Sequence, residues 1–220
     1  MKTHQLAELV LDFDMYPRGK VDSHHAAQMV ASIEAGAELP PLVIDKKTKR
    51  LVDGFHRWRA YKQAYGLNYK VTCIEKTYKD DGELFLDAMR YNASHGRALT
   101  QHDKTHCLIM AKNFKLSDNL VSEALNLTAE RIGELRSTRI AGVAARPIAL
   151  KQTIRHMAGQ KLTKKQETAN TKLSGMNQLF YVNQVCILIE NDLVDTDNSQ
   201  LAKGFIRLRA LLVQHLKKAA

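Results

Sequence analysis

The sequence is short of cysteine and of long apolar runs. Its three cysteines, Cys73, Cys107 and Cys186, lie far apart in apolar segments. So sparse and odd a number predicts reduced, buried thiols and no disulfide framework. The longest apolar run, Val185–Ile189, is far shorter than the ~20 residues that a membrane span needs. The first residues also lack the apolar core of a secretory signal. We therefore expect a soluble, cytoplasmic protein with no membrane partner.

Motifs of several enzyme classes are also missing. The chain contains no Gly-x-Ser-x-Gly elbow, no Walker-type phosphate loop and no zincin pattern. His102 and His106 stand four residues apart beside Cys107, a spacing that metal sites use. Because no further ligands follow at a local metal-site spacing, we expect no metal centre.

The positive charge is concentrated in the middle of the chain. The formal net charge is +10. Residues 1–92 hold 14 basic and 13 acidic side chains, residues 93–174 hold 14 and 6, and residues 175–220 hold 5 and 4. An evenly spread excess would only favour solubility, whereas a basic block predicts a polyanionic partner.

Residues up to about 92 predict a mixed α/β module. Short apolar or alternating runs predict strands near Leu9–Phe13, Leu42–Ile44, Leu51–Val52 and Val71–Cys73. Helices are predicted after the capping residues Asp22 and Ser23, from His56 to a stop at Gly66, and after Asp80 and Asp81.

From Thr100 onward the sequence predicts helices only. The expected helices are 103–113, 118–126, 129–139, 147–158, 164–173, 176–190 and 200–218. Pro147 suits the first turn of its helix, and Gly159 suits the position that ends it. The α/β module should therefore continue into an all-α part.

Residues 117–135 have the spacing of a helix-turn-helix. Apolar residues recur at the offsets that two short packed helices require, with Asn126 at the tight turn and Thr128 as the cap of the second helix. Two amphipathic helices alone would explain this spacing, but the surrounding basic block favours DNA contact. Glu130 and Glu134 would then contact cytosine or remain solvated. The residues expected to contact DNA are Thr128, Arg131, Arg136, Ser137 and Arg139.

The segment Leu51–Ala60 predicts a strand, a glycine turn and a helix that opens on His56 and Arg57. The first turn of a helix has unpaired N–H groups and attracts anions. Gly54 allows close approach of the backbone, and the basic side chains favour phosphate as the anion. The alternative is an ordinary connection with a solvated arginine.

Two further segments leave alternatives open. Residues 92–100 are polar and contain glycine, which is typical of a linker, but they also offer His95 and Arg97 as anion ligands. Near the C-terminus an apolar stripe recurs at helical spacing, formed by Leu201, Phe205, Leu208, Leu212 and Leu216. We expect this stripe to pack at least on Phe180, Val185 and Leu188 within the chain, and a dimer seam is the further alternative.

Together these features resemble the ParB/sulfiredoxin superfamily, and more narrowly ParB-type partition and regulator proteins. The resemblance rests on Arg18 after Pro17, the Asp53–Arg59 turn, Asn92 with Arg97, and the helix-turn-helix. It covers roughly residues 6–140. ParB proteins usually have Gly-Glu-Arg-Arg where this chain has Gly54 to Arg57. Sulfiredoxin needs a cysteine where Phe55 stands, so its reductase chemistry is not expected.

The resemblance implies a ligand for the N-terminal module. In ParB proteins this module binds a nucleotide, and a nucleoside triphosphate (CTP or ATP), with Mg²⁺, is expected here. Because Tyr91 replaces the carboxylate that usually precedes Asn92, phosphate binding is expected more firmly than CTPase-like hydrolysis. The nucleotide or phosphate ligands are then Arg18, Gly54, His56, Arg57, Arg59, Asn92, His95 and Arg97.

The sequence thus predicts an α+β protein in three parts. Residues 1–95 form a ParB/sulfiredoxin-like nucleotide-binding domain, residues 96–174 a helix-turn-helix DNA-binding domain, and residues 175–220 a helical hairpin that supports dimerisation. The expected function is that of a DNA-binding partition protein or transcriptional regulator, located on the nucleoid or a plasmid. The alternatives are a nucleotide-dependent enzyme, either a small-molecule kinase or a nuclease, with Asp53 as the catalytic candidate, and a protein-interaction module with a vestigial pocket.

Overall fold

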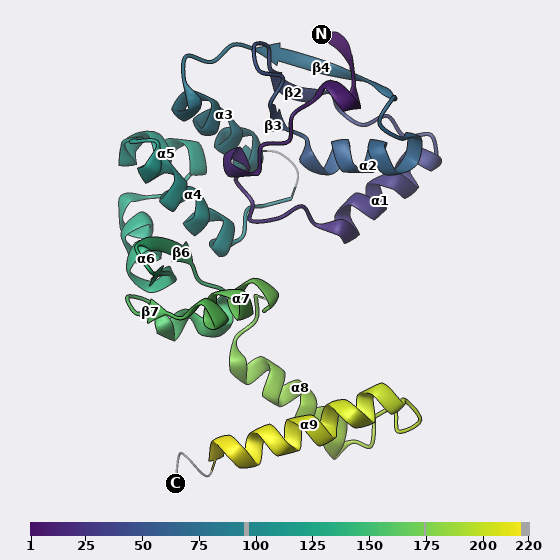
Figure 1. Cartoon of the computed structure of the whole chain (residues 1–220), viewed down its shortest axis with the longest axis vertical. Helices are drawn as coiled ribbons and strands as arrows, with labels where there is room; N and C mark the ends of the chain where they lie inside the picture. The colour runs from purple at the N-terminus through teal and green to yellow at the C-terminus, as the bar shows by residue number, and fades with distance from the viewer. Residues whose placement is uncertain (95–96, 174, 217–220) are drawn as a thin grey trace. The chain divides into compact units, whose positions relative to one another are not determined.

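The computed structural model divides the chain into two compact units, Met1–Gly175 and Met176–Ala220. It describes residues 1–94, 97–173 and 175–216. The first unit begins with a four-stranded sheet and continues into helices and a second, smaller sheet (Figure 1). A mixed α/β part followed by helices is the fold class that the sequence predicts.

The first sheet has the strand order β1-β4-β2-β3. Its strands are β1 (Lys2–Gln5), β2 (Leu42–Asp45), β3 (Leu51–Asp53) and β4 (Lys70–Lys76). Strand β4 is antiparallel to β1 and parallel to β2, which is antiparallel to β3. The helices of this part are α1 (Ser23–Glu34), α2 (Phe55–Tyr65) and α3 (Asp81–Ser94).

Alternate side chains of the sheet face different helices. Leu42, Ile44 and Leu51 join a buried cluster with Phe55 of α2, whereas Val43 and Val52 join one with α3. Period-two alternation is the expected behaviour of a strand that is buried on both faces. Helices α1 and α2 pack on each other (Figure 1).

The predicted strand at Leu9–Phe13 is wrong. Short 3₁₀ turns at Leu6–Glu8 and Phe13–Met15 flank this stretch, and only Val10 makes a β-bridge, to Arg50. Three alternating apolar residues are too short a pattern to distinguish a strand from turns that bury some of the same side chains. Here Leu9 and Met15 are buried and Phe13 is exposed.

The helices after residue 100 occur close to their predicted positions. They are α4 (Gln101–Asn113), α5 (Asp118–Leu125), α6 (Ala129–Arg139) and α7 (Lys164–Lys172). Thr100 caps α4, and its N–H donates in return to the Asp103 carboxylate. Ser117 and Thr128 cap α5 and α6. Asn126 adopts the left-handed conformation (φ 50°) at the turn between α5 and α6, as its residue type predicts.

The expectation of an all-α region is wrong between residues 140 and 162. The predicted helix 147–158 is replaced by β5 (Ile140–Val143), β6 (Arg146–Ala149), a 3₁₀ turn (Gln152–Met157) and β7 (Lys161–Leu162). These strands form a second sheet of order β6-β5-β7. Pro147 lies in β6, at the edge of the sheet, where a residue without an N–H group is tolerated.

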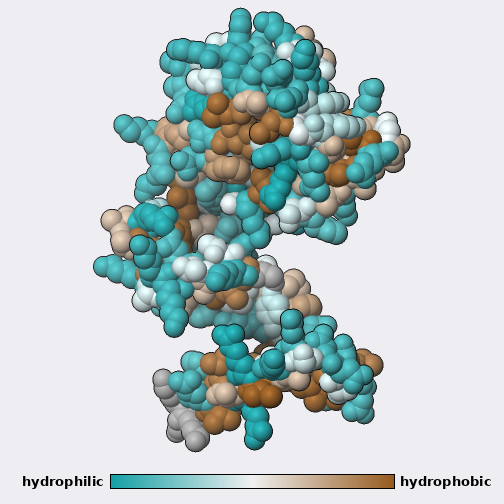
Figure 2. All heavy atoms as spheres, turned by 45° about the vertical axis from the view of Figure 1, so that its right-hand side comes forward, coloured by the Kyte–Doolittle hydropathy of each residue, from teal (hydrophilic) through white to brown (hydrophobic). Residues whose placement is uncertain are grey.

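The second unit contains α8 (Gln178–Glu190) and α9 (Ser199–Leu216). Neither helix has a buried residue. The stripe predicted to pack on Phe180, Val185 and Leu188 is largely exposed, with Leu212 and Leu216 at 49% and 65%. Two helices alone offer too little surface to bury such a stripe. Brown, hydrophobic atoms are visible over these helices in Figure 2. Cys186 lies exposed on α8, unlike Cys73 and Cys107, which are buried as expected.

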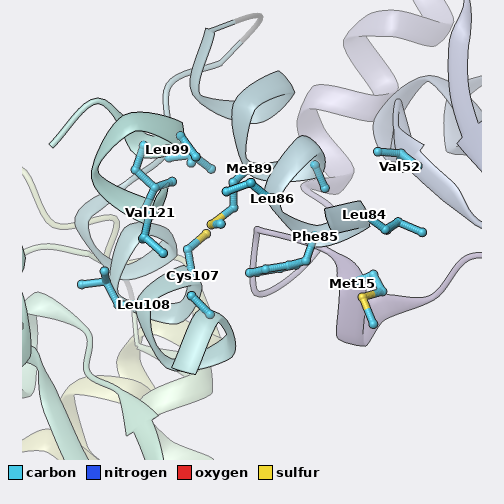
Figure 3. Packing of buried hydrophobic residues seen from close by; sticks show 14 of the residues in the cluster. Met15, Val52, Leu84, Phe85, Leu86, Met89, Leu99, Cys107, Leu108 and Val121 are labelled. Carbon is cyan, nitrogen blue, oxygen red and sulfur yellow. The ribbon is translucent and has the colours of Figure 1, made fainter. Parts of the chain in front are cut away.

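The largest core cluster crosses the predicted boundary between the first two domains. It joins Met15 and Val52 to Phe85 and Met89 of α3, and continues to Cys107 of α4 and the apolar residues of α5 and α6 (Figure 3). One continuous core therefore fixes α5 and α6 to the α/β part. No helix in the described ranges is long and apolar enough to cross a membrane.

Candidate functional site

The turn between β3 and α2 requires glycine at position 54. Gly54 has φ 104°, and a Cβ there would lie 2.5 Å from Cδ2 of Leu42. No side chain caps the start of α2. The backbone N–H groups in the first turn of α2 therefore have no side-chain cap, and they follow a position where only glycine fits. The predicted anion site requires both features.

A cavity of about 510 Å³ opens beside this turn. Most of the predicted phosphate ligands line it, namely Arg18, Gly54, His56, Arg57, Asn92 and Arg97. Arg59 does not, because it points from α2 to a different hollow, next to Trp58 and Lys62. His95 lies outside the described residues. Six of the eight predicted ligands thus line one cavity.

Arg57 is held by groups of its own chain. Its Nη1 donates to the carbonyl oxygens of Pro40 at 2.9 Å and Pro41 at 2.7 Å, and its Nη2 lies 2.5 Å from Oδ2 of Asp53. The two charged side chains form an i,i+4 ion pair that is mostly buried. Asp53, the catalytic candidate, therefore neutralises Arg57 instead of standing free in the cavity.

His56 is neutral within its site. Its Nε2 accepts a bond of 3.0 Å from the N–H of Asp22, which leaves the proton on Nδ1, 3.4 Å from the Tyr16 hydroxyl. Burial, followed by the charges of His25 and Arg18, lowers the pKa of His56 to about 4. At neutral pH His56 thus organises the cavity wall and brings no positive charge to an anion.

Arg18 is buried and bound to three oxygens. Its Nε donates to Oδ1 of Asn92 at 3.2 Å, its Nη1 to the carbonyl of Ala98 at 3.3 Å, and its Nη2 to the carbonyl of Arg97. Asn92 in turn donates to Ala88 O at 2.9 Å. Arg18 also lines a second hollow, of about 220 Å³, next to Lys151.

Arg97 is the most exposed of the cavity arginines that the sequence singles out. Its Nη1 is paired with the carboxylate of Asp22, and half of its side chain is exposed. The backbone N–H of His25, followed by the Arg97 guanidinium, lowers the pKa of Asp22 to about 2. Sequence reasoning recognised Asp22 as a helix cap but missed its role as the partner of Arg97.

Other lining residues were not among the predicted ligands. Tyr16, His25, Pro40, Pro41 and Tyr91 all line the cavity. The Pro40-Pro41 pair directly before β2 is the one local signal among them, since it fixes an extended approach to the sheet. The others are brought together by tertiary packing.

The α5–α6 pair presents the second set of predicted residues. Arg136 donates from Nη1 and Nη2 to the two carboxylate oxygens of Asp118, both at 2.6 Å. Arg131 is paired with Glu134 and also donates to Oε1 of Gln101 at 2.8 Å. Each of these arginines already has a partner on its own surface.

The remaining members of this set are less available. Arg139 is half-buried and donates to Gln152 in the following 3₁₀ turn. Thr128 uses its hydroxyl to cap α6, and Ser137 donates to the carbonyl of Glu134 at 3.1 Å. Exposed ion pairs are worth only about 0–1 kcal/mol, so Arg136 can exchange Asp118 for another anion at small cost.

The described residues hold no group of three His, Cys, Asp or Glu side chains placed to bind a metal ion. Burial lowers the pKa of His102 on α4 to about 4 and also lowers that of His106. Neither histidine therefore carries a positive charge at neutral pH.

Comparison with known proteins returns two bacterial regulators. The chain is 34% identical over 124 residues to the "Streptomycin biosynthesis operon possible regulatory protein" of Streptomyces griseus, and 30% identical over 115 residues to the transcriptional regulator NovG of Streptomyces niveus. These matches cover 56% and 51% of this chain. They span only about a third (34% and 35%) of each relative. No known family profile matches the sequence.

Solved structures give a weaker likeness. The C-terminally truncated chromosome-partitioning protein ParB of Caulobacter crescentus, complexed to the centromeric parS site, is 16% identical with a TM-score of 0.44, over 61% of this chain and 70% of that chain. The same protein complexed with CTP-γ-S is 17% identical with a TM-score of 0.37, over 61% and 75%. Both structures are of a chromosome-partitioning protein, and their identity to this chain is about half that of the two Streptomyces relatives.

The neutral state of His56 leads to a pH prediction. Because its folded pKa, about 4, lies below the ordinary value of 6.5, the unfolded chain binds the proton more readily. The free energy of unfolding should therefore fall as the pH decreases from 6.5 to 4. His56→Phe should reduce this fall by about 2 kcal/mol, measured by urea unfolding at each pH. His24→Gln, on the exposed face of α1, is the control and should keep the wild-type fall. A His56→Phe profile parallel to that of the wild type would contradict the assignment.

Proposed function

We propose that this chain is a ParB-like DNA-binding regulator that uses the α5–α6 pair as a helix-turn-helix. The observation that carries the proposal is the geometry of that pair. Val121, Leu125, Ile132 and Leu135 are buried between the helices and α4. Outside the buried side of α6, Glu130, Gly133, Arg136 and Ser137 are exposed, and this is the face that would enter a major groove.

The curated relatives support a regulatory role. One is named a transcriptional regulator, and the other a possible regulatory protein of the streptomycin biosynthesis operon. A DNA-bound regulator would be found with the nucleoid or with a plasmid. The enzyme alternative has less support, because Asp53, its candidate base, is already paired with Arg57.

DNA binding should depend steeply on salt. Sequencing of captured genomic fragments would identify the site, and fluorescence anisotropy on that duplex would give the affinity as a function of salt. Since each neutralised phosphate contributes about one unit to the slope of log K against log salt, Arg136→Ala should lower the slope by about 1 and weaken binding roughly tenfold. Lys47→Ala, in the β2–β3 turn, should change neither. Absent binding in low salt, or binding insensitive to salt, would exclude this function.

We further propose that the cavity beside Gly54 binds a nucleoside triphosphate. Its volume of about 510 Å³ suits a small ligand. The uncapped start of α2 and the exposed Arg97 are the groups that would hold the phosphates, while Arg18 and Asn92 hold the wall in place. A ligand phosphate would replace Asp22 as the partner of Arg97. Mg²⁺ would accompany the phosphates.

Calorimetric titration tests this proposal. CTP and ATP are titrated separately, with and without Mg²⁺, into the full chain. Arg97→Ala should weaken binding of the preferred nucleotide roughly tenfold, because a charge-assisted bond to phosphate is lost. Arg59→Ala removes an equal charge from outside the cavity and should bind as the wild type does. If neither nucleotide binds, the nucleotide proposal is refuted and the cavity is vestigial. If phosphate is released from a bound nucleotide, the enzyme alternative is favoured.

The second unit supports a homodimer. Val182, Ile206, Leu212 and Leu216 are each about half or more exposed, at 57%, 71%, 49% and 65%. An isolated monomer rarely exposes so many large apolar side chains on two neighbouring elements of the sequence. We infer that a second copy of the chain covers it, since dimers that bind two half-sites are common among helix-turn-helix proteins.

Light scattering after gel filtration should give twice the chain mass of 24.8 kDa. Leu208→Glu combined with Leu212→Glu should convert the protein to a monomer, because two charges would be buried in the seam. Lys203→Glu changes a charge on the same helix, at a position outside the apolar stripe, and should leave the dimer intact. A wild-type monomer at all concentrations would refute the inference.

A further inference from the structure

The basic charge of the middle region lies mainly outside the α5–α6 pair. Between residues 118 and 139 the three arginines face four acidic residues, Asp118, Glu123, Glu130 and Glu134. Residues 140–173, which we call the basic module, contain seven basic side chains and one acidic one. Most of the excess charge therefore lies in a part that was predicted to be helical and that forms the second sheet and α7.

Most of this charge is exposed. Six of the seven basic residues of the module are exposed, namely Arg146, Arg155, Lys161, Lys164, Lys165 and Lys172. Glu167, the acidic residue, is paired with Arg146. Burial, followed by the charges of Arg155 and Arg131, lowers the pKa of Arg139, which shows how closely cations gather where α6 meets the module.

The module is rigidly joined to α6. Strand β5 begins at the residue after α6 ends. Leu150 N donates to Arg139 O at 2.8 Å, and Gly159 N donates to Ile140 O at 2.9 Å. A small core of Ala141, Val143, Leu150 and Leu162 holds the three strands together. The buried Asn170 fastens α7 to this sheet through bonds of 2.9 Å to Lys151 N and Ala149 O.

One surface runs from α6 to the β5–β6 hairpin. A shallow hollow of about 450 Å³ is lined by Arg136 and Ser137 of α6, by the hairpin turn Ala144–Ala145 with Arg146 and Pro147 of β6, and by Lys161 of β7. The turn carries small side chains at Ala144 and Ala145, which permit close approach of a partner. Three cations, Arg136, Arg146 and Lys161, thus lie along one open surface.

We propose that the β5–β6 hairpin and β7 form a second contact with duplex DNA, in which Arg146 and Lys161 bind phosphates beside the groove occupied by α6. The inference rests on the proposed DNA binding by α6 and adds a partner surface to it. A rigid sheet that directly follows the groove-reading helix and carries cations next to it suits the regular phosphate rows of a duplex. The contact would add affinity without selecting bases.

The test compares matched pairs of charge removals in the full chain. Arg146→Ala with Lys161→Ala should lower the slope of log K against log salt by about 2, and should weaken binding to cognate and to unrelated duplexes by the same factor, about tenfold or more. Lys46→Ala with Lys47→Ala removes the same charge from the exposed β2–β3 turn and should leave the slope unchanged. Circular dichroism and a thermal melt establish that both variants fold.

Two single variants keep the proposal testable if the double variant misfolds. Lys161→Glu alone should weaken binding further than Lys161→Ala, and Glu167→Gln should tighten binding a few-fold by freeing Arg146. If Arg136→Ala weakens binding while the hairpin variants behave like the Lys46/Lys47 control, the hairpin contact is refuted and the proposed function stands. If the wild type binds anionic vesicles but no duplex, both are refuted.

Discussion

A single buried guanidinium connects the parts of the first unit. Arg18 reaches Asn92 of α3 and the carbonyl groups of Arg97 and Ala98, and so joins the segment before α1 to the chain that enters α4. Burying the Arg18 guanidinium without hydrogen-bond partners would destabilise the fold by several kcal/mol, so the three acceptor oxygens are required at these positions. Arg18 lines both the cavity beside Gly54 and the smaller hollow next to Lys151. Its bonds therefore fix the shape of that cavity together with the placement of the helices from α4 onward.

The other predicted anion-binding arginines differ in how firmly their own chain holds them. Arg57 is mostly buried, with two carbonyls and a carboxylate around it, whereas Arg97 and Arg136 are more exposed and paired with single carboxylates. Displacing an exposed pair costs little, while breaking a buried one leaves a charge unsatisfied. Arg97 and Arg136 could therefore exchange their carboxylate for another anion at small cost, whereas Arg57 is a fixed part of the cavity wall.

Sequence reasoning succeeded where one residue type has one structural meaning. Asp22 caps α1, Gly54 supplies the positive φ before α2, and Asn126 supplies the left-handed turn before α6. It failed at the second sheet, because Pro147 suits a helix start as well as an edge strand, and because Ala144, a non-glycine with φ 53°, makes a turn that carries no local signal. The carboxylate partners of Arg57, Arg97 and Arg136 were not predicted. They either lie far away in the sequence or had been given another role, such as a helix cap or a catalytic base.

The absence of a linker between α6 and β5 has a mechanical consequence. Main-chain bonds on both sides of Ile140 tie the helix to the sheet, so neither element can tilt alone. Under the DNA binding proposed above, the duplex would have to present its groove and its neighbouring backbone at one fixed separation. An overwound or underwound duplex would then fit one element and not the other, so that binding would depend on local twist as well as on base sequence.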